Sequence, residues 1–549
     1  MDERLDIIAL GGLEEIGLNC TVFRYGDALL VVDAGLMFPE EDMPGVDFVI
    51  PDFSYLIDNR QSIKALILTH GHEDHTGAVP FLLKELSVQV PIYGTALTLG
   101  LLRQKLIEHG IQADLKVVKP RDSVNIGPFE VEFIRVTHSI VDGVGLAINT
   151  PVGTVVHTGD FKLDPTPVDG ELIDFNRFSH YGDRGTLLLL SDSTNAERGG
   201  FTYSEKEVRR ALENIFSTAP GRIIIATFSS NIHRIQQIID VSLKYGRRVS
   251  LCGKSLIANA KIALELGYLK MPEGTWLRLS DIMSLPDNQI VLVTTGSQGE
   301  PMSVLSRIAM DEHKEIKIKP DDTVVLSAKM IPGNERAIGK IINHLFRRGA
   351  NVIYEKVSEV HVSGHASKEE LKLMLNLIRP RFFMPVHGEY RHLCYHAMLA
   401  RKQGIPDENI FLLQNGDVLT IDNTGARVTG QVQAGRVFID GKGGIEDMVL
   451  RDRRRLAHDG ILLILLGMEK PGKVFTGPDI ISKGFVLEES SSEILEEIKS
   501  MIIELLGKLE PEALEDSSIL KAKLRSSIKK FILKRMNRRP MILPIIFEI

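Results

Sequence analysis

The chain of 549 residues is short of cysteine, and this scarcity excludes two kinds of stabilised structure. Its three cysteines, Cys20, Cys252 and Cys394, are odd in number and far apart in the sequence. Neither a disulfide framework nor a cysteine-ligated zinc cluster is therefore expected. Any metal site in this chain must be built from histidine and carboxylate side chains.

Long apolar runs are also missing. No stretch approaches the roughly 18 apolar residues that a membrane-spanning helix requires, and the opening MDERLDIIALGG has no basic segment before its short apolar run. We therefore expect a cytoplasmic protein with no membrane partner. Because the formal net charge is −7, a polyanionic substrate would have to be attracted by local basic surface.

The chain is too long for one hydrophobic core. Its patterns of strands and helices change along the sequence and indicate several domains. As far as about residue 160, short β-branched runs alternate with turns and occasional helical patterns, which indicates sheets with helices packed outside them. From Ser204 onward, apolar strands that end in small polar residues alternate with helices, which is typical of a parallel α/β block. Histidine-rich segments flank this block, so it looks inserted.

The last hundred residues predict a small α+β domain. The strand ILLILLG precedes two helices, at 492–509 and 517–536, each with its apolar residues on one stripe, and MILPIIFEI follows as a closing strand. The second helix and the residues after it are strongly basic, from Lys521 to Arg539. This basic helix is either a solvated face or a contact for RNA or an acidic partner, and the sequence leaves both open.

The densest polar motif is LTHGHEDHTG, residues 68–77. In an extended segment His70 and His72 can point to one side, while Asp74 and His75 lie at the turn into a helix, so two neighbouring metal ions could be bound. Zinc takes about four ligands, so such a binuclear site needs further ligands from elsewhere. A solvated polar loop is the alternative. Three residues at predicted strand ends offer the missing ligands: His138, Asp160, whose carboxylate could bridge two ions, and His387.

Several motifs together resemble a known family. THGHEDHTGA, VTHS and TGDF are similar to the metallo-β-lactamase superfamily, and the inserted block with SGHAS and PVHGEYRH resembles its β-CASP nucleases. Among these, GGLEEIGLNC, SDSTNAERGG, FSSNIHRIQQ and DGKGGIEDMVLRDRR look like bacterial ribonuclease J. The resemblance covers nearly the whole chain and is weakest by motif in the C-terminal domain.

The resemblance implies an α/β fold: a metallo-β-lactamase αββα sandwich with an inserted parallel α/β β-CASP domain and a small α+β C-terminal domain. The expected boundaries are 1–204 and 358–430 for the two parts of the metallo-β-lactamase domain, 205–357 for the β-CASP domain, 431–459 for a linker and 460–549 for the C-terminal domain.

The resemblance also assigns the metal ligands. His70, His72 and His138 would hold one divalent ion, Asp74, His75 and His387 a second, and Asp160 would bridge the two. Zinc is the first expectation because the ligand set is rich in histidine, and manganese is the alternative because it accepts carboxylates.

A catalytic pair and a phosphate pocket are implied in the same way. Asp74, Asp192 and His365 would be catalytic, with Asp192 orienting His365 so that it can protonate the departing 3′ oxygen. Taken without the family, Asp192 is better explained as a turn residue, whereas ordinary polar strand ends are only the alternative explanation of the pocket loops, because Ser363, Gly364 and Ser367 form a small, donor-rich loop suited to a phosphate. His233 is a further candidate for the pocket. The substrate-binding set is Ser229, Ser230, Asn231, His361, Ser363, Gly364, His365 and Ser367.

The leading hypothesis is a metal-dependent ribonuclease that leaves 5′-phosphates and acts in RNA maturation and decay. It would be a 5′-to-3′ exonuclease on 5′-monophosphorylated RNA and also an endonuclease, with the balance between the two left open. RNA is favoured over DNA because DNA-processing β-CASP proteins tend to carry valine where this chain has His387.

The sequence allows two alternative functions. An RNA-binding scaffold subunit of an RNA-processing complex is disfavoured by the intact ligand set, and a metallo-hydrolase of small esters is disfavoured by the large inserted domain. The resemblance further implies a homodimer or homotetramer formed through the C-terminal domain. A paralogue, an RNA helicase or the ribosome are the other partners that it suggests.

Overall fold

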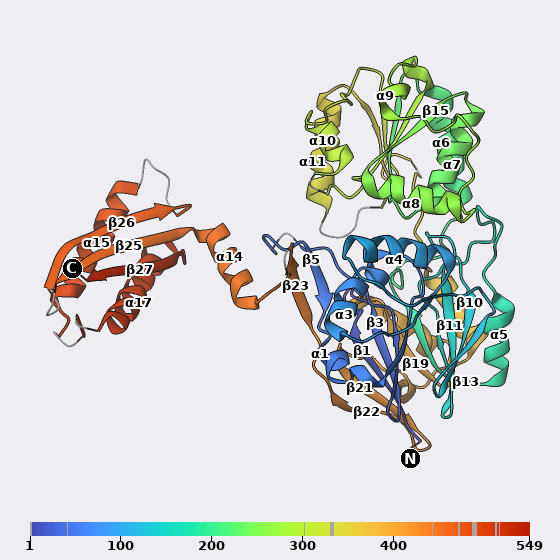
Figure 1. The fold of residues 1–549 in the computed structure, drawn as a ribbon, viewed down its shortest axis with the longest axis horizontal. Coiled ribbons are helices and arrows are strands. Elements are labelled where there is room, and N and C mark those ends of the chain that lie inside the picture. Colours follow the sequence, from blue (N-terminus) through green and yellow to red (C-terminus); the bar gives the residue numbers. More distant parts are fainter. Residues whose placement is uncertain are drawn as a thin grey trace. The chain divides into compact units, whose positions relative to one another are not determined.

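The computed structural model describes residues 3–40, 42–300, 302–329, 334–358, 360–441, 443–469, 473–485, 491–510, 513–514 and 516–548. The chain forms two compact units. One unit comprises Met1–Met37 and Ile50–Arg436, and the other comprises Phe38–Val49 and Val437–Ile549. Figure 1 traces the chain through both units by colour.

Two sheets face each other in the first unit. One has the strand order β22-β21-β1-β3-β4-β6-β7-β8 and the other β19-β13-β12-β11-β10-β9. Apolar side chains of both sheets, among them Ile7, Phe23, Phe133 and Leu190, form one core between them. The strands of the first sheet are Gly425–Gln431, Asp417–Asp422, Leu5–Gly11, Cys20–Tyr25, Ala28–Val32, Ile63–Ile67, Ile92–Gly94 and Leu115–Val117, and those of the second are Phe382–Val386, Thr186–Asp192, Gly153–His157, Val144–Thr150, Phe129–Arg135 and Ser123–Ile126, each set in sheet order.

Helices cover the outer faces of this sandwich. Helices α5 (Phe175–Arg184), α12 (Lys368–Ile378) and α13 (Tyr390–Lys402) pack on the second sheet through a separate apolar cluster that contains Phe178, Met374 and Leu399. Helix α4 (Ala96–Glu108) contacts β7 and β8 of the first sheet. This arrangement confirms the expected αββα sandwich. The shorter elements of this unit include α1 (Ser54–Asp58), α2 (Glu73–Thr76), α3 (Val79–Leu86), β2 (Leu13–Glu14) and β20 (Gly388–Glu389).

The inserted block forms its own five-stranded sheet of order β15-β16-β14-β17-β18. Each neighbouring pair is parallel, as the apolar strands and intervening helices predicted. Figure 1 shows α6 and α7 on one face and α10 and α11 on the other. The strands are Arg248–Cys252, Ile290–Thr294, Ile223–Ala226, Thr323–Leu326 and Asn351–Ile353, and the helices are α6 (Glu205–Thr218), α7 (Ile232–Lys244), α8 (Lys254–Glu265), α9 (Leu279–Ile282), α10 (Val304–Ala309) and α11 (Glu335–Arg347).

Parallel pairing brings the polar strand ends of the sandwich together. Strands β4 and β6 are parallel and end just before Asp33 and Leu68. Strands β12, β13 and β19 are also parallel, and their ends lead to Thr158, Asp192 and His387. The motifs that are far apart in the sequence therefore meet at one edge of the sandwich, where a rigid scaffold presents loops.

The second unit contains the predicted α+β fold. Strand β25 (Ile461–Glu469) pairs antiparallel with β26 (Lys473–Lys483) and parallel with β27 (Met541–Glu548). Helices α15 (Ser491–Gly507) and α17 (Ser517–Met536) bury the expected stripes, including Ile498 and Ile502 of α15 and, from α17, Leu520, Leu524, Ile528 and Ile532.

The segment expected to be a linker, 431–459, carries regular structure. Strands β23 (Arg436–Asp440) and β24 (Gly443–Ile445) form a small sheet with β5 (Phe48–Pro51), and helix α14 covers Asp447–Asp459. The exact domain boundaries stay predictions. Across the part of the chain that the structure describes, none of the helices combines the length and apolar character needed to cross a membrane.

Candidate metal centre and catalytic pair

Two groups of ligand atoms meet at the edge of the sandwich where the strand ends converge. In the first group, His72 Nδ1 lies 3.0 Å from His70 Nε2 and 3.2 Å from His138 Nε2. In the second, Asp74 Oδ2 lies 3.2 Å from His387 Nε2 and 3.7 Å from His75 Nε2. The fold thus brings all the predicted ligand residues together. His70, His72 and His138 form one candidate ligand group and Asp74, His75, Asp160 and His387 a second, while a third, His138, Asp160 and His365, shares one residue with each.

Asp160 lies between the two groups. Its Oδ2 is 3.6 Å from His70 Nε2 and 3.7 Å from His138 Nε2 on one side, and 3.2 Å from His75 Nε2 and 3.6 Å from His387 Nε2 on the other. Among the described residues, no donor makes a well-formed hydrogen bond to this buried oxygen. A buried carboxylate oxygen without a donor is costly, and divalent cations held by the surrounding nitrogen and oxygen atoms would satisfy it.

The charge states of the first group suit metal binding. Burial, together with the charges of neighbouring histidines, holds the pKa of His70 and of His138 well below the usual range and lowers the pKa of His72 to about 4. These rings are therefore neutral near pH 7, which is the form that binds metals.

The second group contains charged side chains whose opposite charges stabilise each other. Burial alone would raise the pKa of Asp160, but the charges of His387 and His75 reverse this and hold it well below the usual range. Burial opposes protonation of His387, yet the negative charges of Asp160 and its neighbours raise the pKa of His387 to about 9. A cation in this group would replace those protons, since metal and proton compete for the same lone pairs.

Fixed oxygen atoms orient three of the ligand rings. His75 Nδ1 lies 2.8 Å from Asp33 Oδ2, His138 Nδ1 lies 2.8 Å from the Gly364 carbonyl, and His387 Nδ1 lies 2.8 Å from Thr194 Oγ1. Such contacts set the ring orientation and direct the other nitrogen towards the centre. Sequence reasoning missed Asp33 and Thr194. Asp33 directly follows β4, whose parallel pairing with β6 brings it to the centre, and this long-range pairing has no local signal in the sequence.

The loops around the centre are packed too tightly for larger residues. A Cβ atom at Gly364 would lie 2.6 Å from His138 Cε1, and one at Gly35 would lie 1.6 Å from the Asp74 carbonyl oxygen. His387 has a φ of +56°, a left-handed conformation that is uncommon for a residue with a side chain. Local strain of this kind collects at functional sites, where the surrounding structure enforces it.

Asp192 and His365 form a close pair beside this centre. Asp192 Oδ2 lies 2.8 Å from His365 Nδ1, and Thr194 holds the other carboxylate oxygen through its backbone N–H and its hydroxyl. Burial lowers the pKa of His365, but the charge and hydrogen bond of Asp192 outweigh this and leave the pKa raised. Because Nδ1 faces Asp192, Nε2 is the nitrogen that can serve a substrate. Asp74, the third predicted catalytic residue, belongs to the second ligand group.

The predicted phosphate loops lie on two elements. Ser229 and Ser230 are half-buried at the end of β14, and Asn231 caps α7 by accepting a hydrogen bond from the Arg234 backbone at 2.9 Å. On the returning segment, the Ser363 hydroxyl accepts from Asn195 Nδ2 at 2.8 Å.

Two other predicted pocket residues have structural surroundings of their own. Ser367 is fully buried, caps α12 and shares a hydrogen bond of 2.9 Å with the Thr202 hydroxyl. It therefore supports the loop that contains Ser363 from the protein interior. Within the described part of the chain, the buried Nδ1 of His361 has no hydrogen-bond partner, and burial with the nearby Arg234 charge lowers the pKa of His361 to about 3. Direct contacts of these residues with a substrate stay predictions.

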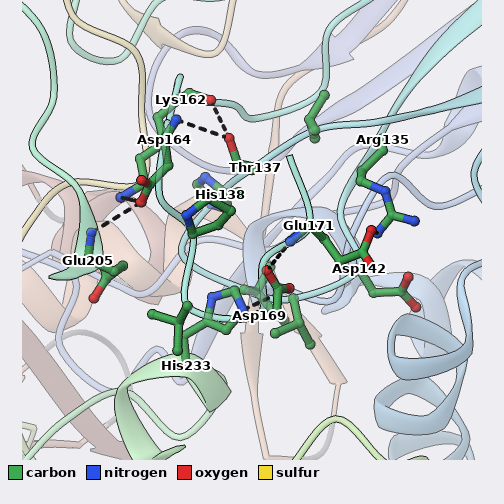
Figure 2. A pocket seen from close by; sticks show the side chains of 15 residues that line it. Arg135, Thr137, His138, Asp142, Lys162, Asp164, Asp169, Glu171, Glu205 and His233 are labelled. Atoms are coloured by element: carbon green, nitrogen blue, oxygen red, sulfur yellow. Dashed lines mark hydrogen bonds and ion pairs between the residues drawn. The ribbon is translucent and has the colours of Figure 1, made fainter. Parts of the chain in front are cut away.

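A pocket adjoins His138 where the sandwich meets the inserted block. Figure 2 shows His233 and Asp169 on one side of it, and their side chains lie 3.1 Å apart. The same view shows Glu205, Asp164 and Lys162 on the opposite side. The structure thus brings His233 to a carboxylate of the sandwich.

Four family models match the chain. They are the Metallo-beta-lactamase superfamily at residues 15–198, the Ribonuclease J beta-CASP domain at 220–345, the Zn-dependent metallo-hydrolase RNA specificity domain at 349–412 and the Ribonuclease J C-terminal domain at 448–549. Their order and extent agree with the fold described above.

Full-length relatives give the same result. The chain is 46% identical over 558 aligned residues to ribonuclease J of Thermus thermophilus, which covers 100% of this chain and 96% of the relative. It is 40% identical over 552 residues to ribonuclease J2 of Bacillus subtilis, with 100% and 99% covered. A crystal structure of a protein of unknown function from Enterococcus faecalis matches with a TM-score of 0.53 and 17% identity over 76% of this chain and 100% of that one, which supports the fold alone.

Proposed function

The chain belongs to the ribonuclease J family of metal-dependent, hydrolytic ribonucleases, and we propose that it cleaves RNA phosphodiesters to leave 5′-phosphates. It would act as a 5′-to-3′ exonuclease on 5′-monophosphorylated RNA and as an endonuclease, in RNA maturation and decay. The observation that carries this proposal is the Asp192–His365 pair, whose His365 Nδ1 lies 3.9 Å from Asp160 Oδ2 at the candidate metal centre.

Two divalent ions fit the ligand groups, with zinc as the first expectation and manganese as the alternative. His70, His72 and His138 would hold one ion and Asp74, His75 and His387 the other, with Asp160 between them. When bound, such ions activate a water molecule for attack and stabilise negative charge on the phosphate oxygens.

His365 supplies the general acid in this proposal. Asp192 holds the imidazolium through Nδ1 and stabilises its charge. As the bond between phosphorus and the 3′ oxygen breaks, the proton on Nε2 passes to that oxygen, and the ring becomes neutral. The raised pKa of His365, which the charge and hydrogen bond of Asp192 cause, extends the pH range in which the ring holds this proton.

The two polar loops support reading of the RNA 5′ end. Hydroxyl and backbone N–H groups in small, half-buried loops are suited to a terminal phosphate. Ser230 at the amino end of α7 and Ser363 on the returning segment would bind the phosphate from two sides. His361 lies two residues before Ser363 in the sequence. A terminal phosphate fixed at one distance from the metal centre would produce stepwise release of mononucleotides.

Assembly through the C-terminal domain, as a homodimer or homotetramer, is part of the proposal. Strand β27 lies at the end of the order β26-β25-β27 and carries the exposed side chains Leu543 and Phe547. Burial of these side chains in a partner would remove an apolar sheet edge from water. A cytoplasmic location and association with a paralogue, an RNA helicase or the ribosome stay predictions, as does RNA contact by the basic face of α17.

The test is digestion of one RNA that carries either a 5′-monophosphate or a 5′-triphosphate, with zinc or manganese supplied and the products resolved to single nucleotides. We expect mononucleotides from the monophosphorylated RNA only, and internal cuts in both RNAs. Cleavage that ignores the 5′ group would overturn the proposed end reading. No cleavage of either RNA in either metal would overturn the proposed chemistry.

A further inference from the structure

One fully buried arginine on α7 joins segments that are far apart in the sequence. Arg234 is 0% exposed. Its guanidinium donates to Glu205 Oε2 at 2.9 Å and to the Val360 carbonyl at 2.8 Å, and also to the carbonyl and the hydroxyl of Ser327. The Ser327 hydroxyl donates in turn to the Val360 carbonyl at 2.7 Å.

The partners of Arg234 lie at the two chain crossings between the sandwich and the inserted block. Glu205 is the first residue of α6, at the predicted boundary where the chain enters the inserted block, and Val360 lies where the chain has just returned. Ser327 follows β17 at the carboxyl end of the parallel sheet. A single side chain therefore binds the outgoing and the returning crossings to the body of the inserted block.

The same arginine bridges the two halves of the proposed phosphate pocket. It lies on α7, whose amino end carries Ser230 and Asn231, and its backbone N–H donates to the Asn231 side chain. Its guanidinium holds Val360, the residue directly before His361. The hydrogen bonds of one residue thus connect the Ser229–Asn231 loop to the returning segment from His361 to Ser363.

Further hydrogen bonds lead from Glu205 towards the metal centre. The Glu205 backbone donates to Asp164 Oδ2 at 3.1 Å, and the Asp164 backbone donates to the Thr137 hydroxyl at 3.4 Å (Figure 2). Thr137 directly precedes the candidate ligand His138. Buried contacts therefore run from α7 of the inserted block to the edge of the ligand cluster.

We propose that Arg234 is a positioning residue that sets the spacing of the phosphate pocket and so makes cleavage depend on the RNA 5′ end. This inference rests on the proposed function, because it concerns how the 5′-monophosphate is read. The planar guanidinium presents several donors in a fixed fork, and a lysine ammonium cannot satisfy the same oxygens in the same directions. With lysine at this position the two pocket halves lose their fixed spacing, while the metal ligands keep their own hydrogen bonds.

The chain offers a matched control in Arg222. This arginine is also 0% exposed and also lies in the inserted block, where it donates to Asp322 Oδ1 at 2.8 Å and to the Lys317 carbonyl at 2.6 Å. It directly precedes β14 and so lies at the amino end of the strand, whereas the proposed pocket lies at the carboxyl end. Arg222→Lys therefore reports the general cost of replacing a buried, ion-paired arginine in this block.

The experiment compares Arg234→Lys, Arg222→Lys and the unmodified chain on 5′-monophosphorylated and 5′-hydroxyl forms of one RNA. Melting temperature and metal content are measured beside kcat and KM. Arg234→Lys should raise KM for the monophosphorylated RNA about tenfold or more and bring the two forms closer together, because small misplacements of binding groups are costly. Metal content and cleavage at internal sites should change little. Arg222→Lys should keep the unmodified preference at a similar melting temperature.

A milder variant covers the case in which Arg234→Lys does not fold. Ser327→Ala removes the hydroxyl that links Arg234 to Val360 and leaves the arginine in place. It should weaken the preference for the monophosphate in the same direction by a smaller factor. If Ser327→Ala and Arg234→Lys both keep the full preference for monophosphorylated RNA, the hydrogen bonds of Arg234 have a structural role only. The same conclusion holds if Arg222→Lys loses this preference to an equal extent. If the unmodified chain itself shows no preference, the proposed end reading fails and the positioning role fails with it.

Discussion

The metal centre and the Ser229–Asn231 loop are built in different ways. The rings of His75, His138 and His387 are each fixed by an oxygen 2.8 Å away, and the centre is packed so closely that no Cβ fits at Gly364. The Ser229–Asn231 loop presents half-buried hydroxyls at the end of one strand. Under the proposed function, this difference would separate the chemistry, at a rigidly held centre, from the choice of substrate, at the Ser229–Asn231 loop.

Loss of the central carboxylate should have the largest effect. Asp160→Ala removes the oxygen that lies between both ligand groups, and we expect cleavage of every RNA to fall to background and the bound metal to be lost. Elemental analysis of the purified variant measures the metal directly. Full metal content in Asp160→Ala would show that the two groups bind their ions independently of this residue.

The next effect should come from the general acid. His365→Ala should lower kcat by roughly 10²–10⁴-fold, since that is the usual contribution of a positioned acid, while metal content stays unchanged. If the variant loses its ions instead, His365 is a ligand and not the acid. In that case the metal centre and the Asp192–His365 pair would not have separate roles.

The pH dependence tests the same pair from another direction. His365 must be protonated to act, so activity should fall as pH rises through its pKa, which Asp192 holds above the usual value. Asp192→Asn removes that negative charge, so the alkaline limb of kcat should move to lower pH. A limb that does not move would mean that another group limits the reaction.

Loss of an orienting residue should have a smaller effect that is confined to the metal centre. Asp33→Asn leaves the ligands in place but weakens the contact with His75 Nδ1, and such changes typically reduce metal affinity by about 10–100-fold. Titration of the metal-free protein with zinc or manganese gives the affinity. Restoration of activity by excess metal would confirm the orienting role, and an unchanged affinity would contradict it.

The smallest effect should come from the Ser229–Asn231 loop. Ser230→Ala removes one hydroxyl from the proposed pocket, so KM for monophosphorylated RNA should rise about tenfold, in line with one hydrogen bond to a charged group. Metal affinity and kcat at internal sites should stay the same. A parallel loss of metal would mean that the two regions are not separate.

The candidate metal ligands that the fold brings together stand out in the sequence because they cluster. His70, His72, Asp74 and His75 lie within six residues, and the remaining ligands stand at recognisable strand ends within quoted motifs. The parallel block and the apolar stripes of α15 and α17 could be predicted for a related reason, since periodicity is a local property.

The residues that tune the site could not be predicted in this way. Asp33, Thr194 and Arg234 act through contacts between segments that are distant in the sequence, and none has a local pattern that separates it from an ordinary polar residue. The predicted linker is similar, because its glycine-rich and charged segment has little apolar periodicity, yet β23 lies there beside β5, a strand from the beginning of the chain. Long-range pairing decided the structure in both cases.

The most direct test of this account is a crystal structure with manganese and a non-cleavable RNA that carries a 5′-monophosphate. We expect two anomalous scattering peaks, one within each ligand group and on either side of Asp160, and a terminal phosphate between the Ser229–Asn231 loop and the segment from His361 to Ser363. A single peak away from Asp160, or a terminal phosphate bound outside those two segments, would contradict it.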